Sequence, residues 1–151
     1  GDNERGYAGC NTNGKTLREA ILEELGCRLD LERIHFLGRV SHQQLIGLFQ
    51  ASWVHVYLSY PFILGWSFLE AMASGCCIVG SKGMPVEEVI QNGVNGILVP
   101  NDSPSLLAVR ILTLLKNTGL REQLSKQARI SSLQWDQLST LPIIEKIIIN
   151  Q

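Results

Sequence analysis

The sequence lacks an excess of charge of either sign, because 13 lysine and arginine residues stand against 14 aspartate and glutamate residues. Its formal net charge at pH 7 is -1. Proteins that bind a nucleic-acid backbone depend on clustered positive charge to neutralise phosphates. We therefore expect no nucleic-acid partner.

Long apolar runs are also missing. None approaches the roughly 20 residues that a membrane-spanning helix needs. The first residues are polar and contain no apolar core typical of a signal peptide. We therefore expect a cytoplasmic protein without a membrane span.

Clustered metal-ligating side chains are absent as well. The cysteines are Cys10, Cys27, Cys76 and Cys77, and the histidines are His35, His42 and His55. No Cys-x-x-Cys spacing occurs, and adjacent cysteines within an apolar run are typical of small buried thiols. The histidines fall in separate predicted elements without matched acidic or cysteine partners, which favours structural roles. We expect no disulfide framework, no metal and no cofactor.

What the sequence does contain is an alternation of β-prone runs and helical patterns. Thr16 with Glu19 forms a capping box, and Ser41 with Gln44 repeats the spacing. The expected helices cover residues 17–25, 41–49, 66–73, 106–115 and 120–130, with another starting at Pro85; the expected strands cover residues 34–37, 54–58, 78–80 and 97–99. Strands separated by helices cannot pair as hairpins, so the pattern predicts an α/β fold with a Rossmann-like parallel sheet flanked by helices on both faces.

The length of 151 residues, 45% of them hydrophobic, suits one domain over residues 1–151. Residues 1–15 are rich in glycine and asparagine, which predicts a loop that follows some earlier element. The terminal segment 136–151 includes a predicted helix, residues 143–149, with an apolar stripe. We expect that helix to pack on a domain missing from this sequence.

One glycine-rich motif suggests a nucleotide hydrolase. Residues Gly9–Thr16 satisfy the phosphate-loop pattern Gly-x-x-x-x-Gly-Lys-Thr. Such a loop needs a buried strand before it, and residues 1–8 are too polar to form one. No later strand ends in an aspartate that could hold magnesium. A surface loop and a helix cap are the favoured alternative.

The segment from Gly65 to Gly75 carries the strongest functional signal. It follows a predicted strand and opens a helix, where the backbone amides of Gly65, Trp66 and Ser67 could bind a diphosphate. Glu70 lies one turn further, and a carboxylate there could accept hydrogen bonds from both hydroxyls of a ribose. A solvated helix residue is an equally good interpretation of Glu70 from its position alone. No Gly-x-Gly-x-x-Gly precedes a helix, which argues against a dinucleotide oxidoreductase.

These motifs resemble those of the GT-B retaining glycosyltransferases of family 4, also called the glycosyl transferases group 1. The resemblance covers about residues 34–116. The matching residues are Phe36 and Gly38, Ser59, the run Gly65 to Gly75, and Pro85, Glu88, Ile90, Gly93, Gly96, Leu98, Val99 and Pro100. The resemblance assigns Glu70 to the ribose hydroxyls, Arg39 and Val40 to the base, and the helix start to the diphosphate.

One departure from the family pattern concerns the sugar. The first glutamate of Glu-x7-Glu should stand at position 62, where this chain has Phe62. Phe62 is a candidate for the sugar side of the site, although for Phe62 and Trp66 packing beside the sheet is the favoured interpretation.

The resemblance implies that the chain is one of the two domains of an enzyme. We expect the chain to be the C-terminal, nucleotide-sugar-binding half of a GT-B fold, with the catalytic residues largely in the missing N-terminal acceptor domain. The parent enzyme would transfer a sugar without a metal onto a saccharide or lipid-linked acceptor, in bacterial polysaccharide or glycoconjugate biosynthesis. The chain alone is expected to be inactive.

Overall fold

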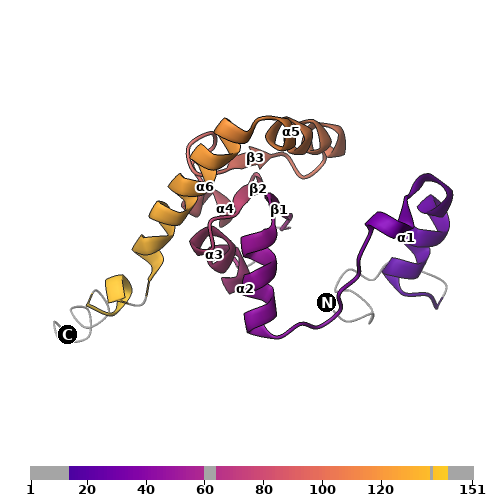
Figure 1. Cartoon of the computed structure of the whole chain (residues 1–151), viewed down its shortest axis with the longest axis horizontal. Coiled ribbons are helices and arrows are strands. Elements are labelled where there is room, and N and C mark those ends of the chain that lie inside the picture. The colour runs from indigo at the N-terminus through magenta and orange to yellow at the C-terminus, as the bar shows by residue number, and fades with distance from the viewer. Residues whose placement is uncertain (1–13, 60–63, 137, 143–151) are drawn as a thin grey trace. The chain divides into compact units, whose positions relative to one another are not determined.

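The computed structural model describes residues 14–59, 64–136 and 138–142 (Figure 1). The contacts divide the chain into two units, Gly1–His42 and Gln43–Gln151. Each unit is described by itself.

The first unit is built on helix α1 (Leu17–Leu25). The Thr16 hydroxyl accepts a hydrogen bond from the Glu19 amide at 3.2 Å, and the Glu19 carboxylate accepts one from the Thr16 amide at 2.7 Å. The predicted capping box is therefore confirmed. Two 3-10 turns follow, Gly26–Arg28 and Leu31–Arg33.

The prediction of a strand at residues 34–37 is wrong, because this segment has no regular secondary structure. Phe36 and Leu37 are 49% and 56% exposed, and the guanidinium carbon of Arg18 lies 3.9 Å from the centre of the Phe36 ring. A β-prone run becomes a strand only when a neighbouring backbone pairs with it. Among the described residues no strand pairs with this run, and Phe36 contacts a side chain of α1 instead.

The second unit contains a parallel sheet. Its first elements are α2 (His42–Ala51), β1 (Val54–Tyr57), α3 (Trp66–Ala73), β2 (Cys77–Ser81), α4 (Val86–Val89) and β3 (Ile97–Val99). The strand order is β1-β2-β3, with Val54 opposite Cys77 and Val79 opposite Ile97. Each crossover passes through a helix, as parallel neighbours require. The predicted α/β class is confirmed.

Helices cover both faces of this sheet. Ile78 of β2 packs with buried residues of α2, α3 and α4, whereas Cys77 and Val79 pack with Leu114 of α5 (Pro104–Lys116) on the other face. Figure 1 shows α5 across the sheet from α2 and α3. All of β2 is buried, which explains its nearly continuous apolar sequence.

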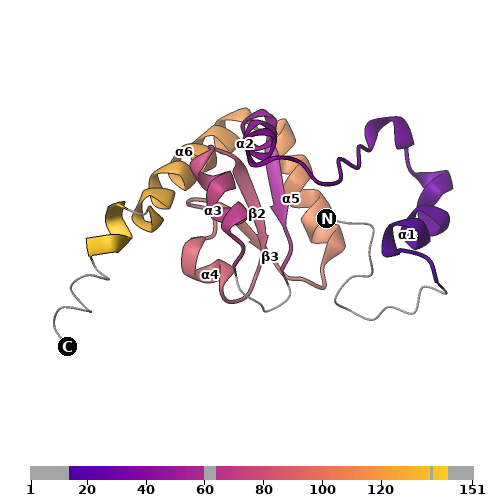
Figure 2. The same cartoon turned by 90° about the horizontal axis from the view of Figure 1, so that it is seen from below.

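Helix α6 (Thr118–Ser132) runs past the sheet and contributes to both apolar clusters (Figure 2). Leu124 packs with Cys77 and Val79, while Ala128 packs with residues of α3. A 3-10 turn, Leu133–Trp135, follows. The helix expected at residues 143–149 lies outside the described residues, so the single-domain assignment and the packing of segment 136–151 stay predictions.

Candidate functional site

The carboxyl ends of the strands meet at one edge of the sheet, because all three run in the same direction. The Ser59 amide donates to Ser81 Oγ at 3.0 Å, and the Ser81 hydroxyl donates to the Ser59 carbonyl at 3.0 Å. Asn101, which follows β3, donates to the same carbonyl at 3.2 Å. Parallel α/β folds bind ligands at this edge, so it is the expected place for a site.

Helix α3 begins beside the end of β1. Its cap residue Gly65 has extended backbone, with φ -72° and ψ 143°, and no side chain caps the helix. The Gly65 amide donates to the Tyr57 hydroxyl at 3.0 Å. First-turn amides have no acceptor within their own helix and lie at the positive end of its dipole. Because the Gly65 amide already donates to Tyr57, the amides of Trp66 and Ser67 are the remaining candidates for the predicted anion site.

The Trp66 side chain is 79% exposed, so the expectation that it packs beside the sheet is wrong. The buried face of α3 is formed by Phe68, Ala71 and Met72, which are all 0% exposed. Trp66 precedes Phe68 by two residues, a spacing that places side chains on different sides of a helix. The indole is therefore available to a ligand or a partner surface.

Glu70 lies on the same face of α3 as Trp66 and Ser67, since it follows them by four and three residues. It is half-buried, and the helix continues past it to Ala73; Gly75, with a φ of 82°, follows the cap residue Ser74 and terminates α3 as predicted. One helix thus presents Trp66, Ser67 and Glu70 together. The contact of Glu70 with a ribose stays a prediction.

The remaining predicted site residues are Arg39, Val40 and Phe62. Arg39 and Val40 belong to the first unit, after Gly38, whose φ is 64°. Their contact with a base stays a prediction. Phe62 lies outside the described residues, so its predicted place on the sugar side stays untested.

Two residues at this edge were missed by sequence reasoning. Tyr57 is the last residue of β1 and bonds the cap of α3. Lys82 directly follows β2 and is exposed. Both residues lie near the ends of the strands predicted at residues 54–58 and 78–80, which was a usable signal for this edge of the sheet, although not for the bond between Tyr57 and Gly65.

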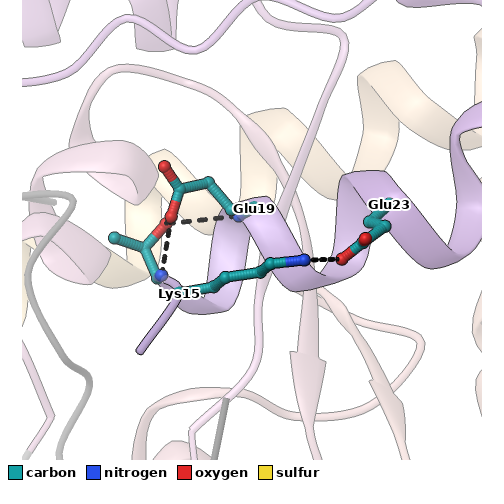
Figure 3. A network of polar contacts seen from close by, with 4 residues as sticks. Lys15, Glu19 and Glu23 are labelled. Carbon is teal, nitrogen blue, oxygen red and sulfur yellow. Dashed lines mark hydrogen bonds and ion pairs between the residues drawn. The ribbon is translucent and has the colours of Figure 1, made fainter. Parts of the chain in front are cut away.

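The phosphate-loop alternative loses support at its described end. The Lys15 ammonium forms an ion pair with the Glu23 carboxylate, and Thr16 takes part in the capping box. Figure 3 shows Lys15 stretched along α1 to Glu23, while Glu19 turns back to the helix start. The Lys15 ammonium and the Thr16 hydroxyl, which would bind phosphate and magnesium in a phosphate loop, here form contacts with side chains of α1. Residues 9–13 are outside the described part.

The cysteines of the second unit are not suited to ligation. Burial raises the pKa of both the Cys76 and the Cys77 thiol to about 11, which keeps them protonated. The Cys76 thiol donates to the Phe49 carbonyl at 2.8 Å. In the described part of the chain, no group of three His, Cys, Asp or Glu residues could hold a metal ion. The described residues also contain no helix that is long and apolar enough to cross a bilayer.

Comparison with known proteins decides the family. The sequence model of the glycosyl transferases group 1 matches residues 9–131. The chain belongs to this family. An uncharacterized glycosyltransferase of Methanocaldococcus jannaschii is 33% identical over 129 residues, covering 76% of this chain and 33% of that protein. The D-inositol 3-phosphate glycosyltransferase of Salinispora arenicola is 30% identical over 122 residues, 79% of this chain and 27% of that protein.

Solved glycosyltransferase structures share the fold. HepE of Anabaena, solved in complex with UDP and glucose, superposes with a TM-score of 0.78 at 26% identity, over 89% of this chain and 37% of that one. The C-terminal domain of a group 1 glycosyltransferase from Francisella tularensis gives a TM-score of 0.67 at 24% identity, over 78% of this chain and 60% of that one. The group 1 chain therefore spans about a third of the length of its curated relatives, and its GT-B resemblance is confirmed.

Proposed function

We propose that this chain binds the nucleoside-diphosphate-sugar donor of a retaining glycosyltransferase. The observation that carries the proposal is the start of α3, which presents Trp66, Ser67 and Glu70 on one face beside the binding edge of a parallel sheet. A protein with the same fold, HepE, was solved with UDP and with UDP-glucose.

In the proposed site, the amides of Trp66 and Ser67 bind oxygens of the diphosphate. These amides need no neutralising side chain of their own, because the helix dipole favours an anion there. The Glu70 carboxylate accepts from the ribose hydroxyls, and Arg39 with Val40 contacts the base. No metal is required in this arrangement.

The parent enzyme, as we propose it, adds an N-terminal acceptor domain that closes over the donor. Enclosure excludes water and orients the sugar toward its acceptor, which is a large share of catalysis in such clefts. The acceptor is a saccharide or a lipid-linked saccharide, in the synthesis of a bacterial polysaccharide or glycoconjugate. The relatives include an enzyme named for transfer to a diphospho-undecaprenol-linked sugar, from Campylobacter jejuni.

The first test is a titration of the chain with UDP, GDP and ADP, followed through the amide resonances. We expect at least one nucleotide to shift Trp66, Ser67 and Glu70, with and without a chelator. Shifts confined to Lys15 and Thr16 on adding ATP would instead support the nucleotide hydrolase.

The second test isolates Glu70. For the best-binding nucleotide, Glu70→Gln should weaken affinity about tenfold or more, because a hydrogen bond to a charged acceptor contributes roughly 1.5–3 kcal/mol. The wild-type chain should prefer the ribonucleotide to its 2′-deoxy form, and the variant should lose that preference. Glu87→Gln, an exposed carboxylate on α4, is the matched control and should keep both. An unchanged preference in Glu70→Gln would refute the ribose contact.

A further inference from the structure

Tyr57 connects the sheet to the first turn of α3. Its hydroxyl accepts the hydrogen bond from the Gly65 amide at 3.0 Å. Its ring meets Phe68 edge-on, with ring centres 4.8 Å apart and planes at 66°. One side chain therefore contacts both the cap residue of α3 and the third residue of its first turn.

The sheet holds Tyr57 in place. Tyr57 is opposite Gly80 of the fully buried strand β2, and a side chain at Gly80 would come within 2.9 Å of Val86. The Tyr57 side chain packs against the buried cluster that contains Phe68, Ile78 and Val86, which limits the movement of its ring. A side chain fixed at the end of a buried sheet can hold the start of the following helix in one position.

The cap itself is arranged by this contact. The Gly65 carbonyl accepts from the Phe68 amide at 3.0 Å, while the Gly65 amide is directed to Tyr57. A Cβ added at Gly65 would lie 3.4 Å from the Tyr57 hydroxyl oxygen and 3.5 Å from Ser67 Oγ. Both hydroxyls therefore lie next to the glycine that opens the helix.

We propose that Tyr57 is a positioning residue for donor binding, which holds the first turn of α3 so that the Trp66 and Ser67 amides meet the diphosphate. This inference rests on the proposed function. In this inference Tyr57 increases affinity for the diphosphate by holding Gly65 in place. It contacts neither the base nor the ribose. Preorganised donors bind more tightly because less ordering is required when the ligand arrives.

The test is Tyr57→Phe, which removes the hydroxyl and keeps the ring that packs on Phe68. The amide proton of Gly65 should shift upfield, as expected when its acceptor is lost. Affinity for the best-binding of UDP, GDP and ADP should fall about threefold to tenfold, the effect of one hydrogen bond. The 2′-deoxy form should weaken by the same factor, in contrast to the result expected for Glu70→Gln.

Ser132→Ala is the matched control for lost stability. It also removes one hydroxyl, which donates to the Arg129 carbonyl at 2.8 Å, from a residue that is 8% exposed on α6. Its affinity should equal that of the wild type in conditions where both variants are folded by circular dichroism.

Several results would overturn the inference: unchanged or tighter binding by Tyr57→Phe, unequal weakening of the ribo and deoxy forms, or an equal loss in Ser132→Ala. If the wild-type chain binds none of the three nucleotides, the proposed function fails and the inference fails with it. If the wild type binds and Tyr57→Phe is unaffected, only the role of Tyr57 is refuted.

Discussion

At the scale of single residues, His55 shows how the sheet constrains a titratable group. Its Nε2 atom is buried and has no hydrogen-bond partner in the part of the chain that the structure describes. Its ring packs edge-on against Phe49, with ring centres 5.0 Å apart. Burial lowers the pKa of His55 below its usual value of 6.5, because the charged imidazolium is poorly solvated there. This supports the structural role expected for this histidine.

The pH dependence of stability follows from that shift. The unfolded chain takes up a proton on His55 below about pH 6.5, whereas the folded chain resists it, so protonation favours unfolding. We expect the free energy of unfolding to decrease as the pH falls through and below 6.5. The contribution of His55 to this decrease in unfolding free energy should be missing in His55→Leu. It should remain in His35→Gln, which alters an exposed histidine. Urea denaturation at several pH values measures it; an identical pH profile in His55→Leu would contradict the explanation.

At the scale of elements, Arg121 ties α6 to the end of α5. Its guanidinium donates to the Leu114 carbonyl at 2.9 Å and the Leu115 carbonyl at 3.3 Å. The same group lies 4.6 Å from the centre of the Trp53 ring. The last carbonyls of α5 have no amide donor within their own helix. Arg121 therefore donates to carbonyl groups that would otherwise have to bind water.

We therefore expect Arg121→Met to lower the free energy of unfolding by about 1–2 kcal/mol, through the lost hydrogen bonds and the lost cation–π contact. Lys126→Met removes the same charge from an exposed site on the same helix and should have little effect. Thermal and urea denaturation would measure both. Equal losses in the two variants would mean that net charge matters here and the contacts do not.

The elements also show where sequence reasoning succeeds. The bounds of α3, residues 66–73, were predicted correctly because a strand break precedes it and a glycine with positive φ ends it. The strand at residues 34–37 was predicted wrongly, because local β-propensity does not reveal whether a pairing partner exists. The role of Tyr57 could not be predicted, since its bond to Gly65 joins two elements and depends on their packing.

At the scale of the whole molecule, a net charge of -1 gives no general attraction for an anionic nucleotide. Any attraction must be local. Of the basic residues described in the second unit, Lys82 is the one that follows a strand, whereas Arg110, Lys116, Arg121, Lys126 and Arg129 lie on α5 and α6. Lys82 therefore places positive charge at the binding edge.

We expect Lys82→Gln to weaken nucleotide binding about twofold to fivefold at about 0.02 M salt and much less at about 0.5 M, since exposed charges are screened. Lys126→Gln serves as the control for net charge and should bind like the wild type. Calorimetric titration at both salt concentrations would test this. A loss in Lys82→Gln that does not depend on salt would point to a direct contact with the ligand.

The strand order β1-β2-β3 follows the order of the chain, so the stretch after each strand reaches the same edge of the sheet. Apart from the Lys82 amide, which donates to the Val99 carbonyl at 2.6 Å, the backbone pairing of the sheet lies within the three strands themselves. We therefore expect side chains after the strands to tolerate substitution with less effect on the sheet than side chains within it. Ligand preference could then change through these side chains with little loss of folding stability, whereas a change at Tyr57 would affect both.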